Sequence, residues 1–269
     1  MRTITSRQNA FVLRCRELAR AHRPVADAVL LDGPHLVEEA RRAGVPIEAV
    51  AVGPRLLGNP LVVGLLAELE AAGTEVFEAT ASVMEAASPV RSPAGIVAIA
   101  RLGPAALEDV FRNRPALVVG AIGLQDPGNV GAIVRTADAA GATGVVVASG
   151  SADPFGWKAL RGSAGSVFRV PVAAGVAAHE ACEHARAGGV RIVAASPADG
   201  QSLDDADLAR PTFLLVGGEG PGLPADLLAA ADCRLRIPMR APVESLNVAV
   251  AAGVVLFEAA RQRRRAAGR

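Results

Sequence analysis

From residue 116 to the C-terminus, short and wholly apolar runs alternate with longer stretches of helical character. Apolar strands without polar alternation are buried on both faces, and strands separated by helices pair in parallel. This pattern predicts an α/β fold with a mainly parallel sheet covered by helices on both faces. The predicted strands are Ala116–Ile122, Gly144–Ala148, Val167–Val172, Val190–Ala195, Thr212–Val216 and Leu235–Ile237, and the predicted helices include Val130–Ala140, Trp157–Gly165, Ala177–Ala187, Leu227–Ala231 and Leu246–Arg263.

The first hundred residues form a smaller α/β unit in this prediction. Helical stretches such as Ser6–Ala21 alternate there with short strands such as Ala28–Asp32. Gly103-Pro104 and Arg112-Asn-Arg-Pro115 then interrupt regular structure. The predicted organisation is a domain over residues 1–100, a linker over 101–115 and a second domain over 116–269.

Composition excludes several classes of protein. The longest apolar run, Val248 to Phe257, is far shorter than the about 20 residues that cross a bilayer, and no apolar stretch of a signal peptide follows the N-terminal arginines. We therefore expect a soluble, cytoplasmic protein with no membrane partner. The three cysteines lack CxxC spacing, and His179 and His184 lie about 140° apart on a helix, so no metal site is predicted.

Positive charge is uneven along a chain whose formal net charge is only +1. Arginines gather at both ends of the sequence, and their planar side chains suit phosphate recognition. The alternative is that they form solvated helix faces, with the C-terminal group favouring a helix dipole. These arginines are Arg2, Arg7, Arg14, Arg16, Arg20 and Arg23 at the start and Arg261, Arg263, Arg264, Arg265 and Arg269 at the end.

Three segments combine polar residues and glycines at places where strands end. In the first, Gly123-Leu-Gln-Asp-Pro-Gly-Asn-Val-Gly follows a predicted strand and leads into a helix. Asn129 and Arg135 are then expected to face the mouth of a site, because ligands of parallel sheets bind beyond the carboxyl ends of strands. The alternative is that Asn129 caps the helix and Arg135 is a surface side chain.

The second segment, Leu214-Leu-Val-Gly-Gly-Glu-Gly-Pro-Gly-Leu-Pro224, places glycines around a single acid, Glu219. Glycines allow the backbone to approach a ligand closely. Neither the dinucleotide fingerprint GxGxxG nor a phosphate-loop Gly-Lys-Ser/Thr is present. The segment is therefore expected to approach a different ligand, or to be a plain connection.

The third segment runs from Ile237 to Gly253: a short strand ends, a loop follows, and a helix begins near Ser245. We expect its regularly spaced apolar residues to form the core face of this helix. Ser245 and Asn247 are either site residues or simple helix caps. The apolar residues of that face are Leu246, Val250, Val254 and Phe257.

Together and in this order, the three segments resemble the signature motifs of the SpoU (TrmH-like) branch of the SPOUT RNA methyltransferases. The stretch from Ala159 to Val172 is similar to the family's RxSxGxxF…P pattern. Ile4-Thr-Ser-Arg-Gln-Asn9 and Pro93-Ala-Gly-Ile96 resemble the ends of the family's N-terminal substrate-binding domain, which is related to the ribosomal protein L30e fold. The resemblance covers nearly the whole chain.

The resemblance implies a SPOUT-type parallel sheet with a C-terminal trefoil knot, preceded by a small L30e-like domain. It implies S-adenosylmethionine as cofactor, no metal, a homodimer, and methyl transfer to a ribose 2′-hydroxyl of RNA. By motif position, backbone around Gly217, Ile237 and Leu246 holds the cofactor. The polar active-site positions are Asn129, Arg135, Glu219, Ser245 and Asn247.

A guanidinium stays protonated in proteins, so Arg135 is expected to hold a phosphate and stabilise developing alkoxide charge rather than act as a base. The N-terminal domain favours 23S rRNA as the substrate. Two alternatives remain: a tRNA ribose 2′-O-methyltransferase, and a non-catalytic RNA-binding module. The absent dinucleotide fingerprint opposes a third, a nucleotide-dependent oxidoreductase. The absence of Tyr makes base stacking a minor part of RNA recognition.

Overall fold

The computed structural model describes residues 1–21, 27–218 and 222–268. The chain forms two compact units. The first unit consists of Met1–Gly103 together with Phe155–Phe168, and the second of Pro104–Pro154 together with Arg169–Arg269. Each unit contains its own sheet.

The second unit is built on a parallel sheet of seven strands, in the order β10-β12-β9-β11-β6-β7-β8. The predicted α/β fold with a parallel sheet is thus confirmed. The strands are β6 (Leu117–Ile122), β7 (Gly144–Ala148), β8 (Val172–Val176), β9 (Arg191–Ala195), β10 (Gln201–Ser202), β11 (Thr212–Gly217) and β12 (Cys233–Arg236). The trefoil knot stays a prediction.

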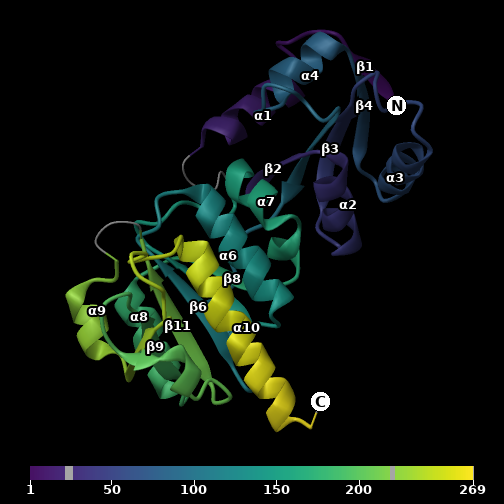
Figure 1. Cartoon of the computed structure of the whole chain (residues 1–269). Helices are drawn as coiled ribbons and strands as arrows, with labels where there is room; N and C mark the ends of the chain where they lie inside the picture. Colours follow the sequence, from purple (N-terminus) through teal and green to yellow (C-terminus); the bar gives the residue numbers. More distant parts are fainter. Residues whose placement is uncertain (22–26, 219–221, 269) are drawn as a thin grey trace. The chain divides into compact units, whose positions relative to one another are not determined.

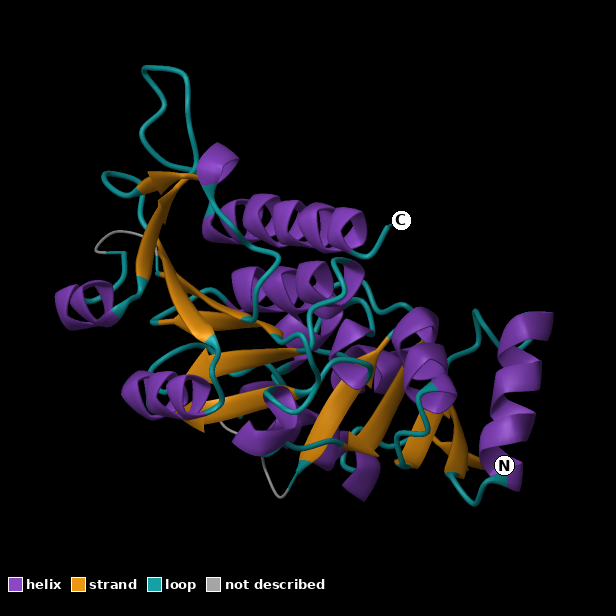
Figure 2. Cartoon of the chain, turned by 90° about the horizontal axis from the view of Figure 1, so that it is seen from below, coloured by secondary structure: helices purple, strands orange, loops and turns teal. Residues whose placement is uncertain are grey.

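Helices cover both faces of this sheet (Figures 1 and 2). The helices α5 (Leu107–Val110), α8 (Ala178–Ala187) and α9 (Ala225–Ala230) pack on one face through a single apolar cluster. The helices α6 (Pro127–Ala139) and α10 (Val248–Ala266) are absent from that cluster and lie side by side (Figure 1). Both begin at the edge of the sheet where the parallel strands end, which brings their first turns to the same place.

Two expectations about the chain after residue 116 are wrong. Residues 166–168 form a 3-10 helix, and the strand lies instead at β8, where it pairs with β7. The core face of α10 also differs from the predicted one, because Val250, Val254 and Phe257 are 40–52% exposed. The buried residues of α10 are Val248, Ala252, Val255, Leu256, Ala259 and Ala260.

The first unit contains a five-stranded sheet in the order β1-β4-β3-β5-β2, in which only β5 runs antiparallel to its neighbours. Its elements are β1 (Arg2–Ile4), α1 (Ala10–Arg20), β2 (Ala28–Asp32), α2 (Pro34–Arg42), β3 (Ile47–Val52), α3 (Pro60–Ala71), β4 (Glu75–Ala79), α4 (Ala81–Ala87), β5 (Ile96–Arg101) and α7 (Trp157–Ser163). The sequence pattern did not predict β1 or α4. The helix α4 forms because the Thr80 side chain caps it and its apolar face is buried.

Within the described residues, no helix combines the length and apolar character that a membrane crossing needs.

Candidate active site

The first turn of α6 carries the first predicted site residue. Oδ1 of Asp126 accepts a hydrogen bond of 2.8 Å from the backbone N–H of Gly128, and Pro127 occupies the first helical position. Asp126 is therefore the N-cap, and the alternative that Asn129 caps this helix is wrong. The half-buried side chain of Asn129 is left to interact elsewhere.

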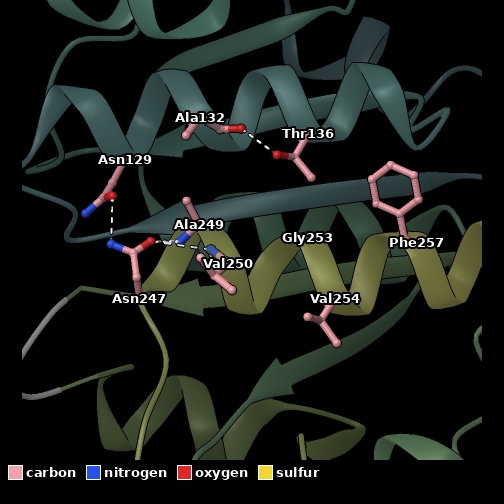
Figure 3. A pocket seen from close by; sticks show the side chains of 9 residues that line it. All are labelled: Asn129, Ala132, Thr136, Asn247, Ala249, Val250, Gly253, Val254 and Phe257. Carbon is pink, nitrogen blue, oxygen red and sulfur yellow. Dashed lines mark hydrogen bonds between the residues drawn. The ribbon is translucent and has the colours of Figure 1, made fainter.

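Asn247 is the N-cap of α10, as one of the two interpretations predicted. Its Oδ1 accepts hydrogen bonds from the backbone N–H groups of Ala249 and Val250, at 2.9 and 3.4 Å. Its Nδ2 donates a hydrogen bond of 3.1 Å to Oδ1 of Asn129 (Figure 3). The first and third sequence segments therefore meet through these two amides.

An open pocket of about 580 Å³ lies between α6 and α10. The two amides stand at one end of it, and apolar side chains form most of its wall (Figure 3). The hydroxyl of Thr136 donates to the carbonyl of Ala132 at 2.8 Å. The lining residues are Asn129, Ala132, Thr136, Asn247, Ala249, Val250, Gly253, Val254 and Phe257.

Arg135 and Ser245 do not line this pocket. Arg135 follows Asn129 by six residues, which places the two side chains about 120° apart around the helix. It is exposed and makes no ion pair or hydrogen bond with the residues that the structure describes. Ser245 is exposed in the segment before α10. Both groups are accessible to a ligand.

The glycine segment approaches the protein's own backbone. A Cβ atom on Gly217 would lie 2.3 Å from the carbonyl carbon of Gly222, and one on Gly218 would lie 2.5 Å from the carbonyl oxygen of Gly123. The second segment is thus packed directly against the first. The sequence pattern assigns these glycines either to ligand approach or to a plain connection, and it misses this contact, which no local pattern signals. Glu219 lies outside the described residues.

Gly217 and Ile237 lie at the carboxyl ends of β11 and β12, with β9 between these strands. Leu246 directly precedes the N-cap of α10 and is 37% exposed. Within the described residues, the backbone of segment 237–246 makes a single internal hydrogen bond, from the N–H of Val243 to the carbonyl of Arg240. Its other amide groups remain available, and backbone donors and acceptors of this kind fit a neutral adenine ring.

Comparisons with known proteins identify both parts of the chain. Residues 116–257 match the model of the SpoU rRNA Methylase family, and residues 9–98 match the MRM3-like substrate binding domain. A tRNA/rRNA methyltransferase of Synechocystis is 34% identical over 262 residues, which cover 97% of this chain and 94% of the relative. The 23S rRNA (guanosine(2553)-2'-O)-methyltransferase RlmP of Bacillus subtilis is 31% identical over 259 residues, covering 96% and 98%.

Solved structures agree with these sequence matches. The AdoMet-bound rRNA methyltransferase of Sinorhizobium meliloti superposes with a TM-score of 0.86 at 32% identity, and the match covers 97% of each chain. The SpoU methyltransferase AviRb of Streptomyces viridochromogenes, in complex with AdoMet, gives 0.86 at 29% identity over 95% of this chain and 98% of that one. With both domains matched in order and the folds superposing over almost their full length, this chain belongs to the SpoU rRNA methylase family.

Proposed function

We propose that this protein transfers the methyl group of S-adenosylmethionine to a ribose 2′-hydroxyl of RNA. The observation that carries the proposal is the hydrogen bond between Asn129 and Asn247, at the edge of the sheet where the predicted cofactor residues also lie. Three segments distant in sequence therefore supply this edge with amides and backbone groups. They also supply Arg135, which has no ion-pair partner among the described residues.

The bound cofactor supplies an electrophilic methyl group, so the protein must mainly align the ribose oxygen and stabilise its developing charge. Backbone around Gly217, Ile237 and Leu246 holds the adenosine end. Arg135 binds the phosphate next to the target ribose. Its permanent positive charge stabilises the negative charge on the 2′-oxygen as the hydroxyl proton passes to water and the oxygen–methyl bond replaces the sulfur–methyl bond.

The remaining polar residues orient the target nucleotide. Asn129 and Asn247 present amide groups from the first turn of α6 and the cap of α10. Ser245 and Glu219 complete the set by their motif positions. No metal is required, because the leaving group is already activated by its positive charge.

The proposed substrate is 23S rRNA, as the activity of the Bacillus subtilis relative RlmP supports. The alternative is tRNA, which the name of the Synechocystis relative also includes. We place the protein in the cytoplasm, where both RNAs are found.

The proposal includes a homodimer built on the face of α10 that points away from the core. Leu246, Val250, Val254 and Phe257 are 37–52% exposed and recur at helical spacing next to α6. A contiguous apolar stripe of this kind marks an interaction site, and a second copy of the same stripe is complementary to it in a two-fold interface. The predicted site residues Asn129 and Asn247 border this stripe.

A methyl-transfer assay tests the function directly. The purified protein is incubated with methyl-labelled S-adenosylmethionine and with protein-free rRNA or tRNA from a strain that lacks it. We expect label in one RNA at a ribose whose 3′-phosphodiester has become resistant to alkali. Binding of RNA and of S-adenosylhomocysteine without transfer would instead support a non-catalytic module. Affinity for NAD(P)H together with no affinity for S-adenosylhomocysteine would support an oxidoreductase.

A further inference from the structure

One edge of the sheet in the first unit gathers the connections that follow its parallel strands. The strands β1, β4, β3 and β2 end at this edge and β5 begins there. Backbone hydrogen bonds join the connections: the N–H of Gly53 donates to the carbonyl of Gly95 at 2.8 Å, and that of Gly33 to the carbonyl of Ile96 at 3.0 Å. The loops are therefore held next to one another.

These connections carry positive charge without negative charge. Residues 5–9, 33–35, 53–59 and 88–95 contain no Asp or Glu. They contain Arg7, Arg55 and Arg91, all exposed and without an ion pair among the described residues. Nothing in these segments neutralises the three guanidinium groups.

A fourth arginine reaches the same edge from α7. Arg161 is exposed, and its charge acts on Asp32, the last residue of β2. Burial raises the pKa of Asp32 above its usual value. A 2.5 Å hydrogen bond from the Ser88 hydroxyl and the charge of Arg161 both lower this pKa, but by less than burial raises it. The half-buried carboxyl of Asp32 is thus occupied by Ser88 and does not pair with Arg161.

The strand ends at the opposite edge show the contrary arrangement. Nη2 of Arg2 lies 3.0 Å from Oε1 of Glu75, and Nε of Arg101 lies 2.5 Å from Oε1 of Glu48. Arginines occur at both edges, but at this one Arg2 and Arg101 are both neutralised by a carboxylate on the neighbouring strand. The N-terminal arginines therefore do not act as one group.

We propose that the edge formed by Arg7, Arg55, Arg91 and Arg161 binds the phosphate backbone of the RNA substrate. The inference rests on the proposed function, because that function requires RNA to be held while a ribose is methylated. Neighbouring strands lie about 4.8 Å apart, so arginines at the ends of β1, β3, β5 and β2 spread over roughly 20 Å. A row of this length suits a chain of phosphates rather than one small anion, and arginine forks bind phosphate oxygens in pairs.

The test compares two double variants of the full-length protein that change the net charge equally. R55Q/R91Q removes two arginines of the proposed edge, and R2Q/R101Q removes two paired arginines of the opposite edge. Dissociation constants for protein-free large-subunit rRNA are measured over a series of KCl concentrations. Thermal melting and S-adenosylhomocysteine affinity are measured alongside.

For R55Q/R91Q we expect the affinity for RNA to fall about tenfold or more. The slope of log K against log [KCl] should become shallower by about 1.5, since each phosphate contact contributes about 0.7–0.9 to that slope. R2Q/R101Q should bind RNA within about twofold of the wild type. An equal loss in both variants, or no loss in either, would overturn the proposal. If the wild type binds RNA by this edge but transfers no methyl group, the proposed function fails while the binding surface stands.

Discussion

Nδ2 of Asn247 donates a hydrogen bond to Oδ1 of Asn129 across 3.1 Å, although the two residues stand 118 positions apart in the sequence. Because Oδ1 of Asn247 is already engaged by two N–H groups of α10, its amide has only one favourable orientation. That orientation fixes the amide of Asn129 in turn, whose Nδ2 then points away from Asn247 (Figure 3). Helix capping and the presentation of a donor at the site are thereby coupled.

Asn247→Asp separates these two roles. A carboxylate caps the helix as well as an amide does, so we expect the free energy of unfolding to change by less than about 0.5 kcal/mol. The variant lacks the Nδ2 donor and turns an acceptor toward Asn129, whose amide must rotate. Methyl transfer should fall about tenfold or more, as measured by single-turnover kinetics. Asn247→Ser is the matched comparison, because serine also caps a helix but cannot donate to Asn129 as the Nδ2 group does; it should lose activity too. Full activity in N247D would refute the coupling.

Arg135→Lys tests the electrostatic role. Lysine keeps the positive charge but cannot bind a phosphate through two parallel N–H groups. We expect weaker methyl transfer, by about tenfold, with unchanged affinity for S-adenosylhomocysteine and an unchanged shape of the pH–rate profile. Near-normal methylation of bound RNA would remove the two-point phosphate contact and leave only a requirement for positive charge at this position.

Phe257→Arg tests the homodimer. Phe257 is 49% exposed on α10. In a two-fold interface the substitution would bury one unpaired arginine from each protomer, which is strongly unfavourable. Light scattering should report a dimer for the wild type and a monomer for the variant. Leu61→Arg, at an 85% exposed position of α3, is the control and should leave the mass unchanged. A wild type that is monomeric at micromolar concentration would contradict the proposal.

Arg263→Met tests a structural contact near the end of α10. The guanidinium of Arg263 donates to the carbonyls of Pro115, Ala116 and Arg210 at 2.7–2.9 Å, and burial lowers its pKa. Methionine removes these hydrogen bonds. The carbonyls of Ala116 and Arg210 keep a donor from Thr212, whereas that of Pro115 loses its donor from Arg263, so we expect a loss of about 1–3 kcal/mol in the free energy of unfolding in urea. Arg264→Met, at an exposed position one residue along, should have an effect below about 0.5 kcal/mol.

Glu258→Gln tests the acid dependence of the same helix. Bidentate hydrogen bonds from Arg261 lower the pKa of Glu258 from 4.5 to about 2. Its contribution to stability is therefore complete above pH 4.5 and is lost as the pH falls toward 2. The variant should be less stable than the wild type at neutral pH, and the difference should shrink across this window in denaturant titrations. Glu85→Gln, an exposed site on α4, provides the comparison; a constant difference at every pH would contradict the assignment.

Much of the fold could be predicted from local pattern alone. Uninterrupted apolar runs gave β6, β7, β9 and β11 to within one or two residues, because a strand buried on both faces excludes polar side chains at every position. Helix starts were less exact: α6 begins three residues before the prediction, since Asp126 rather than Asn129 caps it. The strand β1 and the helix α4 carry no periodic apolar signal long enough to detect.

The amino-acid sequence by itself determined the parallel α/β architecture, the order of the three motif segments and the family to which they belong. Only the tertiary structure decided that Asn129 meets Asn247, that Gly218 packs on Gly123, and which side of α10 is buried. The physical reason is that apolar periodicity shows which faces of a single segment can be buried, whereas these contacts depend on which segments the fold places next to one another. The helix α10 carries apolar residues on two sides, and only the position of its neighbours selects the side that becomes the core.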